Sequence, residues 1–179
     1  GEEGEAQIEA DVTYVNGRER ERDVTSTTTL REPTTTVKAV GTKEKPKTAS
    51  KGYFIWPTSS RRINSHFGGR NLWGRYDYHS GLDIHASYGE GIKAADGGTV
   101  TFAGWQGSYG NLVIITHDNG IQTYYAHNSS LLVSAGSKVY KGQVIAKAGS
   151  TGRSTGPHCH FEVRVNGSAV NPLSYLRET

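Results

Sequence analysis

Hydrophobic positions follow a two-residue period in many short segments of the chain. An early example is Ile8, Ala10, Val12 and Tyr14, where every second residue is apolar or aromatic. Side chains of a strand point alternately to opposite faces, so this period predicts half-buried β-strands. No segment of the sequence keeps a helical period over three turns. The pattern therefore predicts an all-β fold built from antiparallel strands.

Turn signals separate the expected strands. Asn16-Gly17 follows the first alternating segment, and both residue types tolerate the positive φ of a tight hairpin turn. Asp118-Asn119-Gly120 and Asn166-Gly167 stand between later alternating stretches. The clearest strands expected in the second part of the chain are residues 99–103, 112–116, 121–126, 144–148 and 160–165.

Composition divides the chain into two unequal pieces. Residues 1–43 are rich in Thr, Glu and Arg and contain one aromatic residue, so they can form an extended β module but little core. Disorder is the alternative for this piece. Residues 44–52 form a charged linker with one proline, and residues 53–179 form the second piece.

Charge, length and cysteine content exclude several classes of protein. The formal net charge is +3, and the basic excess lies in the second piece. That balance suits an anionic partner, but no basic-aromatic motif supports nucleic-acid binding. No apolar run approaches the length of roughly 18 residues that a transmembrane helix needs, and the first residues do not read as a signal peptide. Cys159 is the single cysteine, so an internal disulfide framework is excluded.

All seven histidines lie in the second piece, and four of them fall into three short groups. The groups are residues 78–83 (YHSGLD), 125–127 (YAH) and 156–162 (GPHCHFE). His158 and His160 are two apart at an expected strand, so both rings point to one face, and Cys159 points to the core. His79 and Asp83 would also share a face of a strand, and Gly81 between them lets backbone or substrate come close.

Two imidazoles and one carboxylate predict a three-ligand zinc site with a fourth position open to water. An open position is typical of a catalytic site, and a site closed by thiolates is excluded by the single cysteine. Zinc lowers the pKa of a bound water to about 7, so a nucleophile exists at neutral pH. Two grouped histidines remain outside the ligand set, and they suit the transfer of protons to and from the substrate.

From Phe54 to Leu176 the chain resembles the lysostaphin and LytM-type zinc endopeptidases of peptidase family M23. The matching stretches are residues 55–57 (IWP), 65–70 (SHFGGR), 79–83 (HSGLD), 96–100 (DGGTV), 125–127 (YAH), 149–152 (GSTG) and 160–162 (HFE). The resemblance implies one zinc ion on His79, Asp83 and His160, with His127 and His158 as the catalytic pair. It further implies a secreted endopeptidase, an autolysin-like hydrolase that cuts peptide bonds in bacterial peptidoglycan. We expect this enzyme to be a monomer.

Three more residues are candidates for contact with the substrate. Arg70 follows a Phe-Gly-Gly turn and could bind a substrate carboxylate or the oxyanion, whereas a plain surface charge is the alternative. His85 shares the face of Asp83, and Tyr78 could form an aromatic wall of the groove. The Phe-Gly-Gly-Arg stretch looks more like the branch of the family that cuts stem-peptide cross-links than like the branch that cuts glycine bridges.

The first piece resembles the C-terminal part of the G5 domain, a small β module found beside cell-wall enzymes. The matching stretches are residues 14–17 (YVNG), 32–33 (EP) and 37–43 (VKAVGTK). The resemblance implies a partial module that contacts cell-wall glycan, and a location in the cell wall of a Gram-positive bacterium.

Other functions are compatible with parts of the sequence. The first alternative is a catalytically silent wall-binding or scaffold protein on the same fold, and the complete histidine set favours the enzyme instead. Residues 137–146 resemble the hairpin half of biotinyl and lipoyl carrier domains, but the chain has no methionine and therefore no Met-Lys pair. A thiol nucleophile at Cys159 is disfavoured because strand alternation points its side chain away from the flanking histidines.

Overall fold

The structure is a computed structural model that describes residues 3–32, 53–72 and 74–177. The chain forms two compact units, residues 1–44 and 45–179, and each is described by itself. The expected linker at 44–52 and the motif at 37–43 lie outside the described residues. Among the residues described, no helix is long and apolar enough to cross a membrane.

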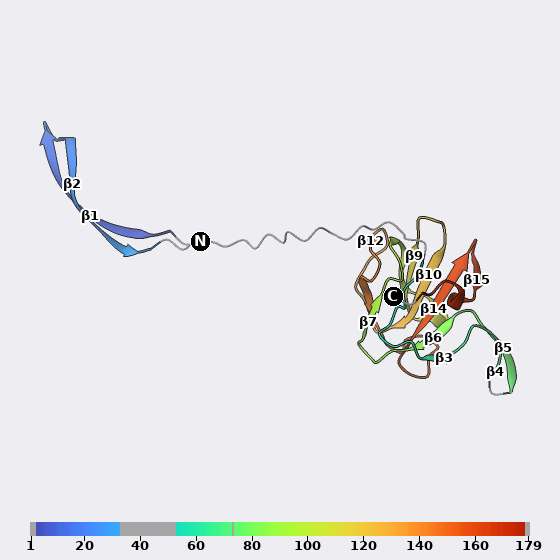
Figure 1. Ribbon diagram of the computed structural model, residues 1–179. Coiled ribbons are helices and arrows are strands. Elements are labelled where there is room, and N and C mark those ends of the chain that lie inside the picture. The colour runs from blue at the N-terminus through green and yellow to red at the C-terminus, as the bar shows by residue number, and fades with distance from the viewer. Residues whose placement is uncertain (1–2, 33–52, 73, 178–179) are drawn as a thin grey trace. The chain divides into compact units, whose positions relative to one another are not determined.

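The first unit is a long β-hairpin. Strands β1 (Glu5–Val15) and β2 (Arg18–Arg31) pair antiparallel, and their register shifts at three points along the curved ribbon of Figure 1. Asn16 and Gly17 form the turn with φ values of 53° and 76°, as the Asn-Gly pair predicts. The alternation predicts half-buried Ile8 and Tyr14, yet they are 58% and 61% exposed. A two-stranded sheet has no second layer to cover either face, so the expectation is wrong for these two residues, whereas Ala10 and Val12 are partly buried.

An antiparallel sheet of eight strands forms the body of the second unit. Seven strands run in the order β12-β8-β9-β10-β14-β6-β3, and β15 pairs with β14 (Figure 1). Their bounds are β3 (Ile63–Ser65), β6 (Leu82–His85), β8 (Gly98–Trp105), β9 (Asn111–Thr116), β10 (Gln122–Asn128), β12 (Lys138–Val139), β14 (His158–Val165) and β15 (Ser168–Val170). The all-β prediction is confirmed, and each strand expected in this part of the chain lies within or overlaps an observed one.

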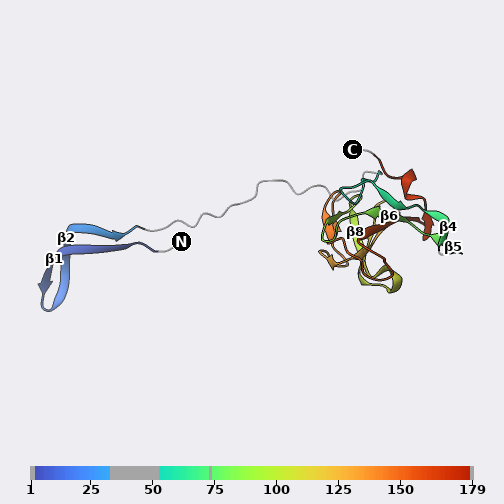
Figure 2. The same ribbon diagram turned by 90° about the horizontal axis from the view of Figure 1, so that it is seen from below.

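Smaller elements complete the second unit. A three-stranded sheet contains β7 (Gly91–Lys93), β11 (Ser130–Leu131) and β13 (Val144–Lys147). Strands β4 (Gly68–Leu72) and β5 (Arg75–His79) form a hairpin that projects from the body in both Figure 1 and Figure 2. Two short 3-10 helices, η1 (Gly107–Tyr109) and η2 (Pro172–Ser174), are also present.

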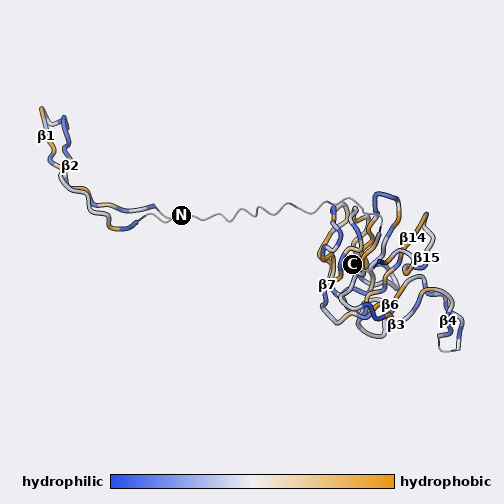
Figure 3. Tube along the Cα trace, viewed as in Figure 1, coloured by the Kyte–Doolittle hydropathy of each residue, from blue (hydrophilic) through white to orange (hydrophobic). Residues whose placement is uncertain are grey.

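The core lies on one face of the large sheet, against the three-stranded sheet. Alternate residues of β14, namely Cys159, Phe161 and Val163, are fully buried in it, and the rings of Tyr125 and Phe161 lie 5.4 Å apart. Hydrophobic positions follow the strands of this unit in Figure 3. The residues between them on β14, His158, His160 and Glu162, therefore occupy the opposite face, which carries the site.

Candidate metal centre and active site

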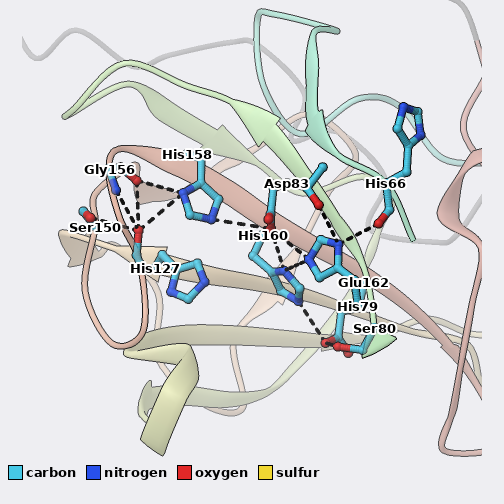
Figure 4. Close-up of polar contacts among 12 residues, drawn as sticks. His66, His79, Ser80, Asp83, His127, Ser150, Gly156, His158, His160 and Glu162 are labelled. Carbon is cyan, nitrogen blue, oxygen red and sulfur yellow. Dashed lines mark hydrogen bonds and ion pairs between the residues drawn. The ribbon is translucent and has the colours of Figure 1, made fainter. Parts of the chain in front are cut away.

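Three side chains from three strands converge on the open face of the large sheet. His79 ends β5, Asp83 lies in β6, and His160 lies in β14, where it pairs directly with Asp83. His79 Nε2 and His160 Nδ1 lie 3.1 Å apart, and Asp83 Oδ1 lies 3.1 Å from the first and 2.9 Å from the second. Figure 4 shows the three side chains pointing toward one another. They form a group that could hold a metal ion.

His79 and Asp83 do not lie in one strand, which corrects the sequence expectation. The chain leaves β5 at His79, passes through Ser80 and Gly81, and enters β6 at Leu82. A Cβ atom at Gly81 would lie 2.5 Å from the backbone oxygen of Phe161. Glycine is required here because the strand containing His160 presses against this connection, and the close approach brings Asp83 beside His160.

Hydrogen bonds fix which nitrogen of each ring faces the metal position. His79 Nδ1–H donates to the backbone oxygen of His66 at 2.8 Å, which leaves Nε2 without a proton. His160 Nε2–H donates to Glu162 Oε1 at 3.0 Å, which leaves Nδ1 without a proton. Neutral imidazole binds a metal through the nitrogen that carries no hydrogen.

The donor set fits a zinc ion. With both rings neutral, three lone-pair atoms face one another with no hydrogen between them, and a cation stabilises such an arrangement. A tetrahedral zinc ion with bonds of about 2.0–2.1 Å sets its ligands roughly 3.3 Å apart. The separations here are 2.9–3.1 Å. Two imidazoles and a carboxylate are also a ligand set found in catalytic zinc sites.

Two further histidines stand next to this group. His127 lies near the end of β10 with φ of 62°, at an irregularity in the pairing with β9. Its Nδ1–H donates to the Thr151 carbonyl, and His158 Nδ1–H donates to the Gly156 carbonyl, both at 2.8 Å. The two ring centroids are 4.8 Å apart (Figure 4). In both rings Nε2 is therefore the nitrogen that faces away from the backbone anchor, and that of His158 lies 3.5 Å from Asp83 Oδ1.

The charges of the site are set by burial and by these hydrogen bonds. Burial opposes ionisation of Asp83, but the imidazole rings of His158, His160 and His79 that surround the carboxylate hold its pKa well below the usual range. Burial lowers the pKa of His127 to about 4. At neutral pH the group therefore contains an ionised carboxylate beside a neutral His127.

A groove of about 790 Å³ contains all five of these side chains. Arg70, Tyr78 and His85, the three candidates for substrate contact, line the same groove. The guanidinium of Arg70 is held by Asp77 at 2.8 Å and by Ser65 at 2.6 Å. Tyr78 is 57% exposed, and His85 Nδ1 accepts a hydrogen bond from Arg62 at 2.8 Å.

Several residues of the site were not singled out by the sequence. Arg62 and Arg153 line the groove, and neither belongs to a motif that identifies it. Glu162 accepts a hydrogen bond from His160. Because it follows His160 by two residues on one strand, strand alternation alone predicts that both side chains share a face. The carbonyls of His66, Thr151 and Gly156 hold ring nitrogens, and no residue type identifies a backbone oxygen in advance.

The fold and this set of side chains are those expected of a metallopeptidase, and known proteins give the family. Residues 77–172 match peptidase family M23, and residues 1–43 match the G5 domain. The chain belongs to peptidase family M23, as the sequence motifs predict.

Two relatives and one solved structure illustrate this kinship. "DD-carboxypeptidase/endopeptidase Mpg" of Neisseria meningitidis is 46% identical over 130 residues, which cover 72% of this chain and 30% of the relative. "Murein hydrolase activator EnvC" of Escherichia coli is 35% identical over 159 residues, which cover 89% of this chain and 37% of the relative. A zinc-containing peptidase of Vibrio cholerae superposes with a TM-score of 0.64 at 33% identity, covering 69% of this chain and 40% of that one.

The comparisons also bear on location. The chain spans about a third of the length of these curated relatives, and Gram-negative bacteria are the source of both. The expectation of a Gram-positive source is therefore not supported. That expectation came from the likeness of the first piece to a wall-associated module, and no residue of such a module reports on the type of envelope.

Proposed function

We propose that this chain is a zinc-dependent endopeptidase that hydrolyses peptide bonds in peptidoglycan cross-links. The observation that carries the proposal is the complete set of five side chains in one groove. His79, Asp83 and His160 would hold the ion, and His127 and His158 stand beside it with Nδ1 anchored on a backbone carbonyl. When bound, zinc would supply Lewis acidity, which polarises a carbonyl and acidifies water.

The two histidines that are not ligands would move protons. His127 is neutral at pH 7 because burial lowers its pKa to about 4, so its Nε2 can accept the proton of the attacking water. His158 stands 4.8 Å away between ring centroids and can carry a proton to the leaving amine. The carbonyls of Thr151 and Gly156 hold both rings in the orientation that this work needs.

The charge of the groove supports stem-peptide cross-links over glycine bridges. Three arginines line it, Arg62, Arg70 and Arg153, and the facing carboxylates are Asp83 in the lining and Asp77, which pairs with Arg70. Stem peptides carry carboxylates and glycine bridges carry none, so guanidinium groups favour the former. The relative Mpg, named a DD-carboxypeptidase/endopeptidase, supports the same choice. Arg70, Tyr78 and His85 would contact this peptide.

A second candidate function is activation of another hydrolase by this chain without catalysis of its own. The likeness to EnvC, named as a murein hydrolase activator, favours it. The intact set of three ligands and two further histidines favours the enzyme. In either case the hairpin of the first unit would contact cell-wall glycan and so hold the chain at the wall, outside the cytoplasm. The chain would act there as a monomer.

The deciding experiment measures zinc content together with release of fragments from purified peptidoglycan. We expect the intact chain to hold about one zinc and to cleave, His79→Ala to lose the metal, and His127→Ala to keep the metal without cleaving. Mass spectrometry of the fragments identifies the bond. An intact chain that binds zinc but cuts neither type of cross-link would instead support the activator.

A further inference from the structure

A fully buried carboxylate lies directly behind one metal-binding histidine. Glu162 is 0% exposed and follows His160 by two residues on β14, so both side chains lie on the site face of the sheet (Figure 4). A carboxylate removed from water is costly unless hydrogen bonds satisfy its oxygens. Glu162 must therefore be stabilised by nearby hydrogen-bond donors.

Four donors satisfy Glu162. Its Oε1 accepts from His160 Nε2–H at 3.0 Å, from Ser80 Oγ at 2.5 Å and from the Tyr109 hydroxyl at 2.8 Å. Its Oε2 accepts from Arg164 Nε at 2.7 Å, and Arg164 Nη2 also reaches the Tyr109 oxygen at 3.0 Å. The carboxylate is held on every side, so it offers His160 an acceptor with a fixed position.

His160 differs from the other three histidines of the site in how its second nitrogen is held. His79, His127 and His158 each donate Nδ1–H to a backbone carbonyl, at 2.8 Å in every case. His160 instead donates Nε2–H to a charged side chain. It also presents the opposite nitrogen, Nδ1, to Asp83 and His79. A carboxylate behind an imidazole fixes its tautomer and raises its basicity more than a neutral carbonyl does.

We propose that Glu162 is a positioning residue that holds His160 in the tautomer with Nδ1 free, and thereby sets the affinity of the site for its metal. Ser80, Tyr109 and Arg164 keep the carboxylate in place. Without Glu162, the His160 ring could carry its proton on Nδ1 or turn over, and either change removes the lone pair from the metal position. The inference rests on the zinc site of the proposed function.

A purely structural role for Glu162 makes a different prediction. The same contacts join β14 to Ser80 and to η1, so removing them would weaken the fold. In that case the unfolding free energy would fall, while the affinity of the folded protein for zinc would stay the same. Metal affinity measured on folded protein therefore separates the two roles.

The experiment titrates metal-free protein with zinc in competition with a chromophoric chelator. Glu162→Gln keeps the size of the side chain and removes its charge, and we expect zinc binding about 10–100-fold weaker. Glu90→Gln is the matched control, because Glu90 also accepts several hydrogen bonds, from Ser59 and Ser87, and touches none of the ligands. Its affinity should equal that of the unchanged chain.

The outcomes distinguish this inference from the function on which it rests. If the unchanged chain binds no zinc, the proposed function fails and this inference fails with it. If the unchanged chain binds zinc and folded Glu162→Gln binds it equally well, only the inference is overturned. Should Glu162→Gln not fold, ¹⁵N correlation spectra of the zinc-loaded unchanged chain decide. They should show a slowly exchanging proton on His160 Nε2, and a proton on Nδ1 would refute the proposal.

Discussion

The hairpin of residues 5–31 and the large sheet of the second unit are both antiparallel, yet they differ in how far their apolar side chains are buried. No described side chain of the hairpin is buried, although Ile8, Val24 and Leu30 are apolar. In the second unit a three-stranded sheet covers one face, and residues such as Ile115 and Phe161 are 0% exposed. Alternating apolar side chains form a core only where a second layer covers their face of the sheet. The opposite face then stays open and can carry a functional site.

The largest difference in unfolding free energy between the two units should appear when one large apolar side chain in each is shortened to alanine. Ile115→Ala opens a cavity in the covered layer of β9 and should cost about 2–5 kcal/mol of unfolding free energy. Leu30 is 59% exposed on β2, so Leu30→Ala should change the unfolding free energy by no more than about 0.5 kcal/mol. Urea unfolding followed by tryptophan fluorescence reports on the second unit, and far-UV circular dichroism reports on both. Equal costs would show that the hairpin has a hidden covering layer.

Glycine substitutions sharpen the same comparison. Gly81→Ala places a Cβ 2.5 Å from the Phe161 oxygen, which pushes β6 away from β14 and separates Asp83 from His160. A misplacement of about 1 Å in such a site costs on the order of 10²-fold in kcat/KM, and zinc content should fall as well.

The matched change in the hairpin is Gly17→Ala. Gly17 has open space around it but a φ of +76°, so alanine there meets only backbone strain of roughly 1–2 kcal/mol. It should loosen the turn and leave zinc content and kcat/KM unchanged. Metal analysis and peptidase assays on both variants test the pair, and full activity in Gly81→Ala would contradict the argument for close approach.

The strong alternation around His158 and His160 predicts the strand that carries both histidines. Cys159 lies in the core and His158 and His160 on the open face, as the two-residue period predicts. The same reasoning was wrong for His79 and Asp83, because a spacing of four does not reveal that the chain breaks at Gly81 between two strands.

Other features depend on contacts between distant segments. The anchors of His79 and His127 are carbonyls of His66 and Thr151, which are 13 and 24 positions away, and any residue type could supply them. The exposure of the hairpin also depends on what else packs beside it. Local pattern predicts the strands and the residue types of the site, whereas tertiary packing decides which nitrogen points where.

Acid should affect the second unit through its buried histidines, and the described hairpin contains none. Burial lowers the pKa of His117 below its ordinary value of 6.5, so the folded chain binds this proton less readily than the unfolded chain. Its Nδ1–H donates to Gly97 and its Nε2 accepts from Thr123, so the folded state requires a neutral ring. Its contribution to stability is therefore present above about pH 6.5 and is lost as the pH falls from there.

His117→Gln should flatten the fall of the urea midpoint between pH 7.5 and pH 5. The exposed His66 provides the control, and His66→Gln should keep the slope of the unchanged chain. A slope that His117→Gln leaves intact would assign the acid sensitivity to other groups, such as His127, whose pKa burial lowers to about 4.

The smallest effect on the second unit is expected from removing the first unit altogether. The core and the site of the second unit are built from residues 54–176, so deletion of residues 1–52 should change its unfolding free energy by no more than about 0.5 kcal/mol. Hydrolysis of a soluble cross-linked peptide should be equally unaffected, while co-sedimentation with intact peptidoglycan should weaken if the hairpin contacts wall glycan. A truncated chain that sediments as well as the full chain would place all wall affinity in the groove. A truncated chain that loses soluble-peptide activity would show instead that the hairpin takes part in the reaction.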